Sequence, residues 1–175
     1  NVWRSFVMMN YATDVVGNFK IDLDGIPLST AGGNVADIEI QYDGFKVLVE
    51  VTMSTGQKQY EMENESVARH YGKAQNLTTE PVYCIFIAPQ INEASLAYFY
   101  DKNIKAPKFY AGKTRIVPMN ISQFVTFVTI ARDKGFKHSS VLKAYLESVI
   151  SKNRSVDDET IWSQHINDTI PTWVS

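Results

Sequence analysis

Two acidic residues are of chemical interest because the sequence predicts that they face each other across a β-hairpin. The segments 35–42 and 45–52 alternate between apolar and polar residues, and Asp43-Gly44 separates them. An Asp-Gly pair between two alternating segments is typical of a two-residue hairpin turn. In the register that this turn sets, Asp37 lies opposite Glu50.

Such a pair of acids needs a compensating positive charge. Opposed residues on neighbouring strands have Cβ atoms about 4.5–5.5 Å apart, and like charges there are destabilising. Glu50 also lies within the apolar segment 47–51, whose residues favour burial. A divalent cation would relieve the repulsion, because hard cations such as Mg²⁺ bind carboxylate oxygens, backbone carbonyls and water. A proton shared between the acids, or an arginine partner, would relieve it as well.

The segment that follows the hairpin offers further polar candidates on one helical stripe. Gln59, Glu63, Val67 and His70 are spaced four, four and three residues apart, so they share one face of a helix. This places Glu63 and His70 within reach of the end of the hairpin. Two other interpretations stay open: a solvated acidic turn near a helix N-terminus, and a surface histidine beside Arg69.

These residues together resemble the PD-(D/E)XK nuclease core, in which an Asp begins one strand and an acid-x-Lys triplet lies on the next. Here Asp37 is followed thirteen residues later by Glu50-Val51-Thr52. With the segments 33–37 and 59–70, the chain resembles type IIS restriction endonuclease cleavage domains of the AlwI and BstNBI type, which include nicking enzymes. It is more distantly similar to the FokI cleavage domain. The motif-bearing part is 33–72.

The resemblance implies roles for individual residues. Asp37 and Glu50 would be metal ligands, and the Val51 carbonyl would complete the shell of the cation. Glu63 would be a further catalytic acid that touches a metal directly or through water. His70 would be the fourth catalytic residue.

The chain departs from the family pattern at two places. The usual lysine of the triplet is Thr52, so its role in orienting and deprotonating water falls to another residue, with His70, Gln59 and Lys58 as candidates. Many nucleases of this fold also carry a Glu on the first helix, whereas this chain has no Glu before Glu39. Asp14, or an acid upstream of Asn1, would serve instead, or the acid is dispensable.

The activity that the resemblance implies is Mg²⁺-dependent hydrolysis of one strand of double-stranded DNA, with Mn²⁺ able to substitute. A separate recognition domain or subunit would read the site, and the cut would fall at an offset from it. Cutting both strands would require homo- or heterodimerisation. The expected enzyme is prokaryotic and cytoplasmic, with no membrane partner. Two alternatives stay open: a repair- or structure-directed nuclease, and a non-catalytic DNA-binding or assembly module of the same fold.

Basic residues near the motif are candidates for contacts with DNA phosphates. Lys58, Arg69 and Lys73 lie on the predicted helix, and Lys113 and Arg115 follow later in the chain. Solvated surface charge is the alternative interpretation for each of them.

The elements that must position these residues alternate along the chain, which predicts an α/β fold with a mixed β-sheet flanked by helices. The resemblance implies that this sheet is PD-(D/E)XK restriction-endonuclease-like. A helix over 59–71 is expected to end at Gly72, and an apolar segment at 82–88 predicts a strand buried on both faces. The other expected elements are helices at 2–11, 93–102, 120–131 and 139–150 (capped by Ser139 or Ser140), an amphipathic tail from 157, and strands at 19–23 and 114–119.

Length and composition set the outer limits. The 175 residues predict one domain over 1–175, which the resemblance makes a nuclease cleavage domain, and the start at Asn1 leaves open a fragment or subunit of a larger enzyme. One cysteine, Cys84, excludes a disulfide framework and predicts a buried thiol. The net charge of −2 argues against binding DNA by bulk charge alone. It fits a domain that a partner delivers to DNA.

Overall fold

A five-stranded mixed sheet forms the centre of the computed structural model, which describes residues 1–24, 28–29 and 32–175. The strands, in spatial order, are β1 (Asp14–Gly17), β2 (Ile38–Tyr42), β3 (Phe45–Val51), β4 (Val82–Ala88) and β5 (Ile116–Asn120). β1, β2 and β3 pair antiparallel, whereas β3, β4 and β5 pair parallel. The mixed sheet and its flanking helices confirm the predicted fold class.

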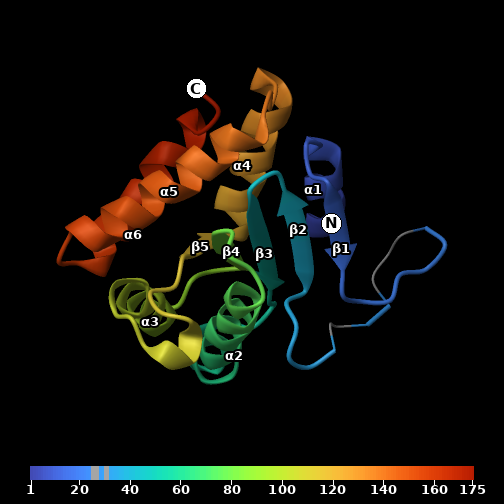
Figure 1. Cartoon of the computed structure of the whole chain (residues 1–175). Helices are drawn as coiled ribbons and strands as arrows, with labels where there is room; N and C mark the ends of the chain where they lie inside the picture. The colour runs from blue at the N-terminus through green and yellow to red at the C-terminus, as the bar shows by residue number, and fades with distance from the viewer. Residues whose placement is uncertain (25–27, 30–31) are drawn as a thin grey trace.

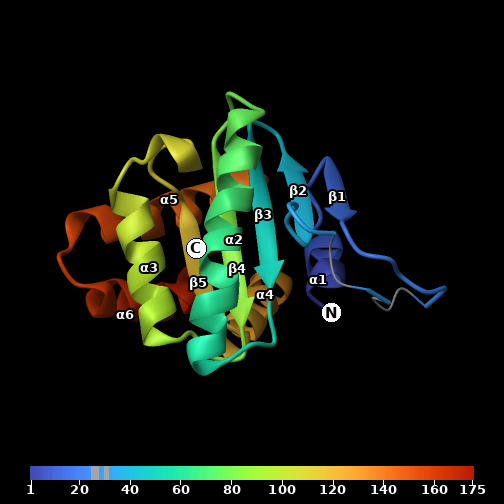
Figure 2. The same cartoon turned by 90° about the horizontal axis from the view of Figure 1, so that it is seen from below.

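Helices cover both faces of the sheet. They are α1 (Val2–Met9), α2 (Gly56–Asn76), α3 (Glu93–Ile104), α4 (Ile121–Lys134), α5 (Ser139–Ser155) and α6 (Glu159–Thr169), with short 3₁₀ turns η1 (Lys108–Tyr110) and η2 (Ile170–Thr172). α2 and α3 lie on one face, while α1, α4 and α5 lie on the other (Figure 1). α2 and α3 are the crossovers that parallel strands require. In Figure 2, α2 begins near the carboxyl end of β3 and runs back along the sheet.

The predicted hairpin register is confirmed. Tyr42 pairs with Phe45, and farther from the turn Ile38 pairs with Val49. Gly44 has a φ of 75°, a left-handed conformation that glycine adopts without steric cost. The two-residue turn therefore fixes which residues of β2 and β3 share a face.

The core is apolar and rich in aromatic rings. All seven residues of β4 are buried, as its continuous apolar sequence predicts. The Cys84 thiol is buried there, and burial raises its pKa. Behind the sheet, the rings of Phe127 and Trp173 stack with centroids 4.2 Å apart. Trp162 is buried and donates to the Val149 carbonyl, so α6 packs on the core.

Three local predictions are wrong. The strand expected at 19–23 does not form; β1 lies earlier in the chain, and only an isolated bridge remains at Ile21. α2 does not end at Gly72 but continues to Asn76. A Cβ at Gly72 would lie 2.8 Å from the Tyr110 Cα, so this glycine permits close packing of α2 against η1.

The third wrong prediction concerns the cap of α5. His138 precedes the helix, and its ring nitrogen accepts a hydrogen bond from the Ser140 N–H. A side-chain acceptor before the first turn is what a helix N-terminus requires, and histidine supplies it here in place of serine. None of the described helices is long and apolar enough to cross a membrane.

Candidate active site

Asp37 lies directly before β2, where its carboxylate bridges to the end of β3. Its Oδ2 accepts a hydrogen bond from the Val51 N–H at 2.8 Å. The next N–H, that of Thr52, donates in the other direction to the Ile87 carbonyl of β4. The Val51 N–H therefore points toward β2, and the Asp37 carboxylate is its hydrogen-bond acceptor.

Glu50 is the second acid, and it is buried, with 7% of its surface exposed. Burial raises the pKa of its carboxyl group, and the charge of Asp37 raises it further. Hydrogen bonding and charge attraction from His70, together with a hydrogen bond from the Asp37 N–H, oppose the rise without cancelling it. The Asp37 carboxylate thus lies close enough to Glu50 for its charge to contribute to the raised pKa.

His70 joins the pair from α2. Its Nδ1 lies 2.7 Å from Glu50 Oε1. An ionised carboxylate only accepts, so Nδ1 carries the proton when Glu50 is charged. The Nε2 atom is buried and has no hydrogen-bond partner within the described parts of the chain. A buried nitrogen without a partner is costly, which makes this atom a candidate contact for a bound ligand.

Glu63 lies on the same stripe of α2 but is engaged elsewhere. Its Oε1 accepts from Thr52 Oγ1 at 2.9 Å and from Ser54 Oγ at 3.4 Å. Thr52 is buried, and its hydroxyl also accepts from the Ser54 N–H at 3.0 Å. The residue that replaces the lysine of the triplet thus holds Glu63 by its side chain. Glu63 as a cation ligand stays a prediction.

Gln59, a candidate to replace the missing lysine, is a structural residue. Its side chain is fully buried. Its Nε2 donates to the carbonyls of Ser54 and Gln90, and its Oε1 accepts from the Asn92 N–H at 2.8 Å. These bonds hold the loop after β3 against the loop after β4 and leave the amide occupied.

The chemistry of the donor set fits a hard cation in part. Asp37 and Glu50 supply neighbouring carboxylate oxygens, which are ligands that Mg²⁺ prefers. Within residues 1–24, 28–29 and 32–175, however, no group of three or more His, Cys, Asp and Glu side chains is arranged to hold a metal ion. The two-carboxylate core is assembled, while the Val51 carbonyl and Glu63 stay predicted ligands.

The basic residues predicted to contact DNA do not form one patch. Lys58 is exposed in the first turn of α2, and Lys73 is exposed near its other end. Arg69 pairs with Glu65 at 3.2 Å and donates to the side chain of Asn34. Arg69 thereby ties α2 to the segment that leads into Asp37.

One polar residue near the acids was not singled out by sequence. Asn18 directly follows β1, and its N–H donates to the Asp37 carbonyl at 2.9 Å. No spacing rule connects it to the motif, because β1 ends at Gly17 and β2 begins only at Ile38. The pair Val15-Val16 before Gly17 is the local signal that could have indicated the strand.

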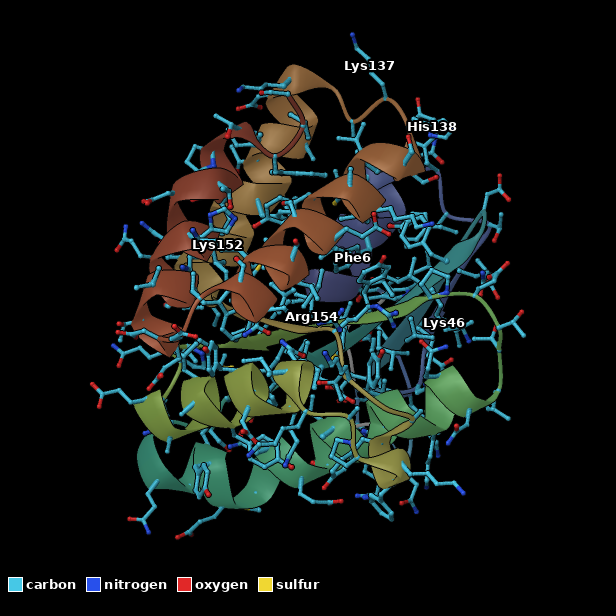
Figure 3. All side chains as sticks on the ribbon, turned by 60° about the vertical axis from the view of Figure 1, so that its left-hand side comes forward. Phe6, Lys46, Lys137, His138, Lys152 and Arg154 are labelled. Carbon is cyan, nitrogen blue, oxygen red and sulfur yellow. The ribbon has the colours of Figure 1, made fainter. Side chains whose placement is uncertain are left out.

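A second polar cluster lies at the opposite end of the sheet, before β5. The buried Asn103 side chain is bonded to Thr114 and to the backbone of Ile116. Arg154 donates to the Asn103 and Thr114 carbonyls, and Arg115 donates to the Tyr71 hydroxyl at 3.0 Å. Figure 3 shows Arg154, near the end of α5, between the helical layers.

Comparison with known proteins agrees with this architecture. A solved structure, the small subunit (R.BspD6I2) of the heterodimeric restriction endonuclease R.BspD6I, superimposes with a TM-score of 0.81 at 24% identity. The match covers 95% of this chain and 86% of that chain. No curated protein matches. The family model of the AlwI restriction endonuclease matches residues 1–127 of the 175. The chain therefore belongs to the AlwI restriction endonuclease family.

Proposed function

We propose that this member of a family of restriction-type nucleases is the Mg²⁺-dependent cleavage unit of an offset-cutting endonuclease, and that it hydrolyses one strand of double-stranded DNA. The observation that carries the proposal is the meeting of Asp37 and Glu50 at the end of the hairpin, where burial and mutual repulsion raise the pKa of Glu50. A divalent cation bound between the two carboxylates would offset their mutual repulsion.

Asp37 and Glu50 would hold the cation, which when bound polarises the scissile phosphate and lowers the pKa of a bound water. Other groups of the chain orient these two carboxylates. The Val51 N–H orients the Asp37 carboxylate. His70 orients Glu50 through Nδ1, and its buried Nε2, which carries no proton in this tautomer, is available as a hydrogen-bond acceptor. Mn²⁺ would substitute for Mg²⁺.

A partner that reads the DNA sequence is part of the proposal. The net charge of −2 and the dispersed basic residues offer little phosphate neutralisation, which is the main source of DNA affinity. The similar solved structure is one subunit of a heterodimeric enzyme. We therefore propose that a recognition domain or a second subunit delivers this chain to DNA, and that cutting both strands requires a second active site.

The test is nicking of a supercoiled plasmid by the chain fused to a DNA-binding domain of known site. We expect Mg²⁺- and Mn²⁺-dependent open circles at a fixed distance from the site. Asp37→Ala and Glu50→Ala should abolish them, while Glu61→Gln, which changes an exposed acid of α2, should not. Nicking that survives both alanine substitutions would refute the assignment of the two acids.

A readout independent of catalysis is the effect of the cation on stability. A ligand that binds only the folded state raises the unfolding temperature as its concentration rises. We expect Mg²⁺ to stabilise the wild type and to have no effect on Asp37→Ala. No stabilisation of the wild type at any Mg²⁺ concentration would refute the proposed cofactor.

Thr52 favours a second candidate, a non-catalytic DNA-binding or assembly module. It stands where the PD-(D/E)XK triplet usually carries lysine, and its hydroxyl is already bonded to Glu63. A module of this kind would bind DNA with its partner and show no nicking under any metal condition. The plasmid assay separates the two candidates, because the fused chain would still occupy its site.

A further inference from the structure

Asn18 holds the main chain on both sides of Asp37. Because Gly17 pairs with Ile38, the next position along β1 brings Asn18 opposite Asp37. The Asn18 N–H donates to the Asp37 carbonyl at 2.9 Å. Its side-chain Nδ2 donates to the Ala36 carbonyl at 2.8 Å and to Glu39 Oε1 at 3.3 Å. The bonds therefore reach the residues before, at and after the acid.

The orientation of the Asn18 amide is fixed by its partners. A backbone carbonyl and a carboxylate only accept hydrogen bonds, so the atom that faces both must be the nitrogen. Glu39 is in turn held by Lys46 at 3.0 Å. A side chain without two N–H donors at position 18 would leave the Ala36 carbonyl and Glu39 without this partner.

Asp37 needs such an anchor because of where it lies. It precedes β2, and residues 32–35 before it are exposed. On its other side, its carboxylate is the partner of the Val51 N–H. The acid is thus held by β3 through its side chain and by Asn18 through its backbone carbonyl, and the contact between Asn34 and Arg69 ties the segment that leads into it to α2.

We propose that Asn18 is a positioning residue that fixes the backbone of Asp37, so that the Asp37 carboxylate stays on the Val51 N–H and beside Glu50. The effect of Asn18 on metal binding rests on the proposed function. The effect of Asn18 on the position of the Asp37 backbone rests on the hydrogen bonds alone. Partners that orient a metal-binding carboxylate typically contribute 10–100-fold to metal affinity or activity.

The mechanical part is measured by hydrogen exchange of the Val51 amide, followed by NMR. This N–H faces Asp37 while its neighbour bonds to β4, so its protection reports the position of the carboxylate. We expect Asn18→Ala to speed its exchange by about tenfold. Asn18→Asp keeps the size, removes both donors and adds a charge beside Glu39, so its effect should be larger. Asn167→Ala, an exposed asparagine of α6, is the matched control and should change nothing.

The metal part is measured by Mn²⁺ titration of the same proteins, read by the electron paramagnetic resonance of the free ion. We expect the dissociation constant to rise by about 10–100-fold in Asn18→Ala. In the plasmid assay, the Mn²⁺ concentration for half-maximal nicking should rise by a similar factor, while the rate at saturating Mn²⁺ should fall far less. A residue that only stabilises the fold would not shift this concentration in protein that remains folded.

The two parts fail in different ways. Unchanged Val51 exchange in both Asn18 variants would overturn the positioning role whatever the enzyme does. A wild type that neither binds Mn²⁺ nor nicks DNA would refute the proposed function, and the exchange experiment would still decide whether Asn18 holds Asp37. Faster exchange with unchanged Mn²⁺ affinity would overturn the link between this anchor and the metal.

Discussion

Both ends of the sheet bury polar side chains, but the hydrogen bonding of these side chains differs between the two ends. At the end before β5, the Asn103 amide donates to Ile116 and accepts from Thr114 Oγ1 and the Ile116 N–H, all at 2.7–2.9 Å. At the end after β3, Glu50 is buried beside Asp37 and its pKa is raised, and the Nε2 of His70 has no partner in the described chain.

This difference distinguishes polar groups that serve folding from polar groups that serve a ligand. Hydrogen bonds that are complete in the folded chain stabilise it by about 1 kcal/mol each. Like charges that remain close, or a buried nitrogen without a partner, lower stability until a ligand completes them. Substitutions at the two ends should therefore change different properties.

The largest effect should come from Asp37→Asn. Loss of the charge that holds the cation removes several kcal/mol of transition-state stabilisation, and each 1.4 kcal/mol is about tenfold in rate. We expect plasmid nicking to fall by about a thousandfold, with an unchanged or higher unfolding temperature. A large loss of thermal stability in this variant would contradict the assignment of Asp37 to the ligand-serving end.

The opposite result is expected for Asn103→Ala. Three buried hydrogen bonds disappear, so the free energy of unfolding should fall by about 3 kcal/mol. Urea unfolding measures this loss. Nicking per folded molecule, measured well below the unfolding temperature, should match the wild type.

Glu50→Gln should raise stability, and the gain should depend on pH. Because the folded-state pKa of Glu50 lies above its ordinary value, the folded state binds this proton more tightly than the unfolded state. Stability is therefore lost as pH rises through the ordinary pKa to the raised one, and it stays lower above. Glutamine removes this loss, so without metal the variant should be more stable at pH 8, on the order of 1 kcal/mol.

At pH 3 the gain from Glu50→Gln should vanish, because Glu50 is protonated in both states. Guanidinium unfolding at the two pH values gives the difference. Equal free energies of unfolding for wild type and variant at pH 8 would show that the charge on Glu50 does not lower the stability of the folded state. Saturating Mg²⁺ should reverse the order at pH 8, because only the wild type binds it.

The smallest effect should be on DNA affinity. Lys58 lies at the end of α2 near the acids, whereas the exposed Lys113 lies at the other end of the sheet. If Lys58 meets one phosphate, Lys58→Gln should reduce the slope of log affinity against log salt by about 1. Lys113→Gln is the matched control and should leave the slope unchanged. Fluorescence anisotropy with the fused chain measures both, and equal slopes would remove Lys58 from the interface.

The hairpin could be predicted from sequence in detail because its determinants are local. The Asp43-Gly44 turn and the alternation on both sides fix the pairing, since a slip of one residue would move every apolar side chain to the other face. The meeting of Asp37 and Glu50 follows from that register, so the core of the site was readable before any long-range contact was known.

The contributions from distant segments could not be predicted in the same way. β1 has four residues, all exposed or half-buried, so it carries little of the apolar signal that identifies a strand. The helical stripe of α2 brought Glu63 and His70 to the end of the hairpin, where His70 contacts Glu50 and Glu63 contacts Thr52. The partners of these two side chains depend on how α2 crosses the sheet. In the structure, Glu63 bonds to the Thr52 hydroxyl rather than contacting the Asp37–Glu50 pair.

The Asp43-Gly44 turn also affects the rate at which the site forms. A hairpin closes within about 1–10 μs, whereas the parallel pairing of β3 with β4 must wait for the longer loop that contains α2 to close. We therefore expect the two acids to meet before His70 arrives. Their repulsion then slows an early step, so that protons or divalent cations would accelerate folding as well as stabilise its product.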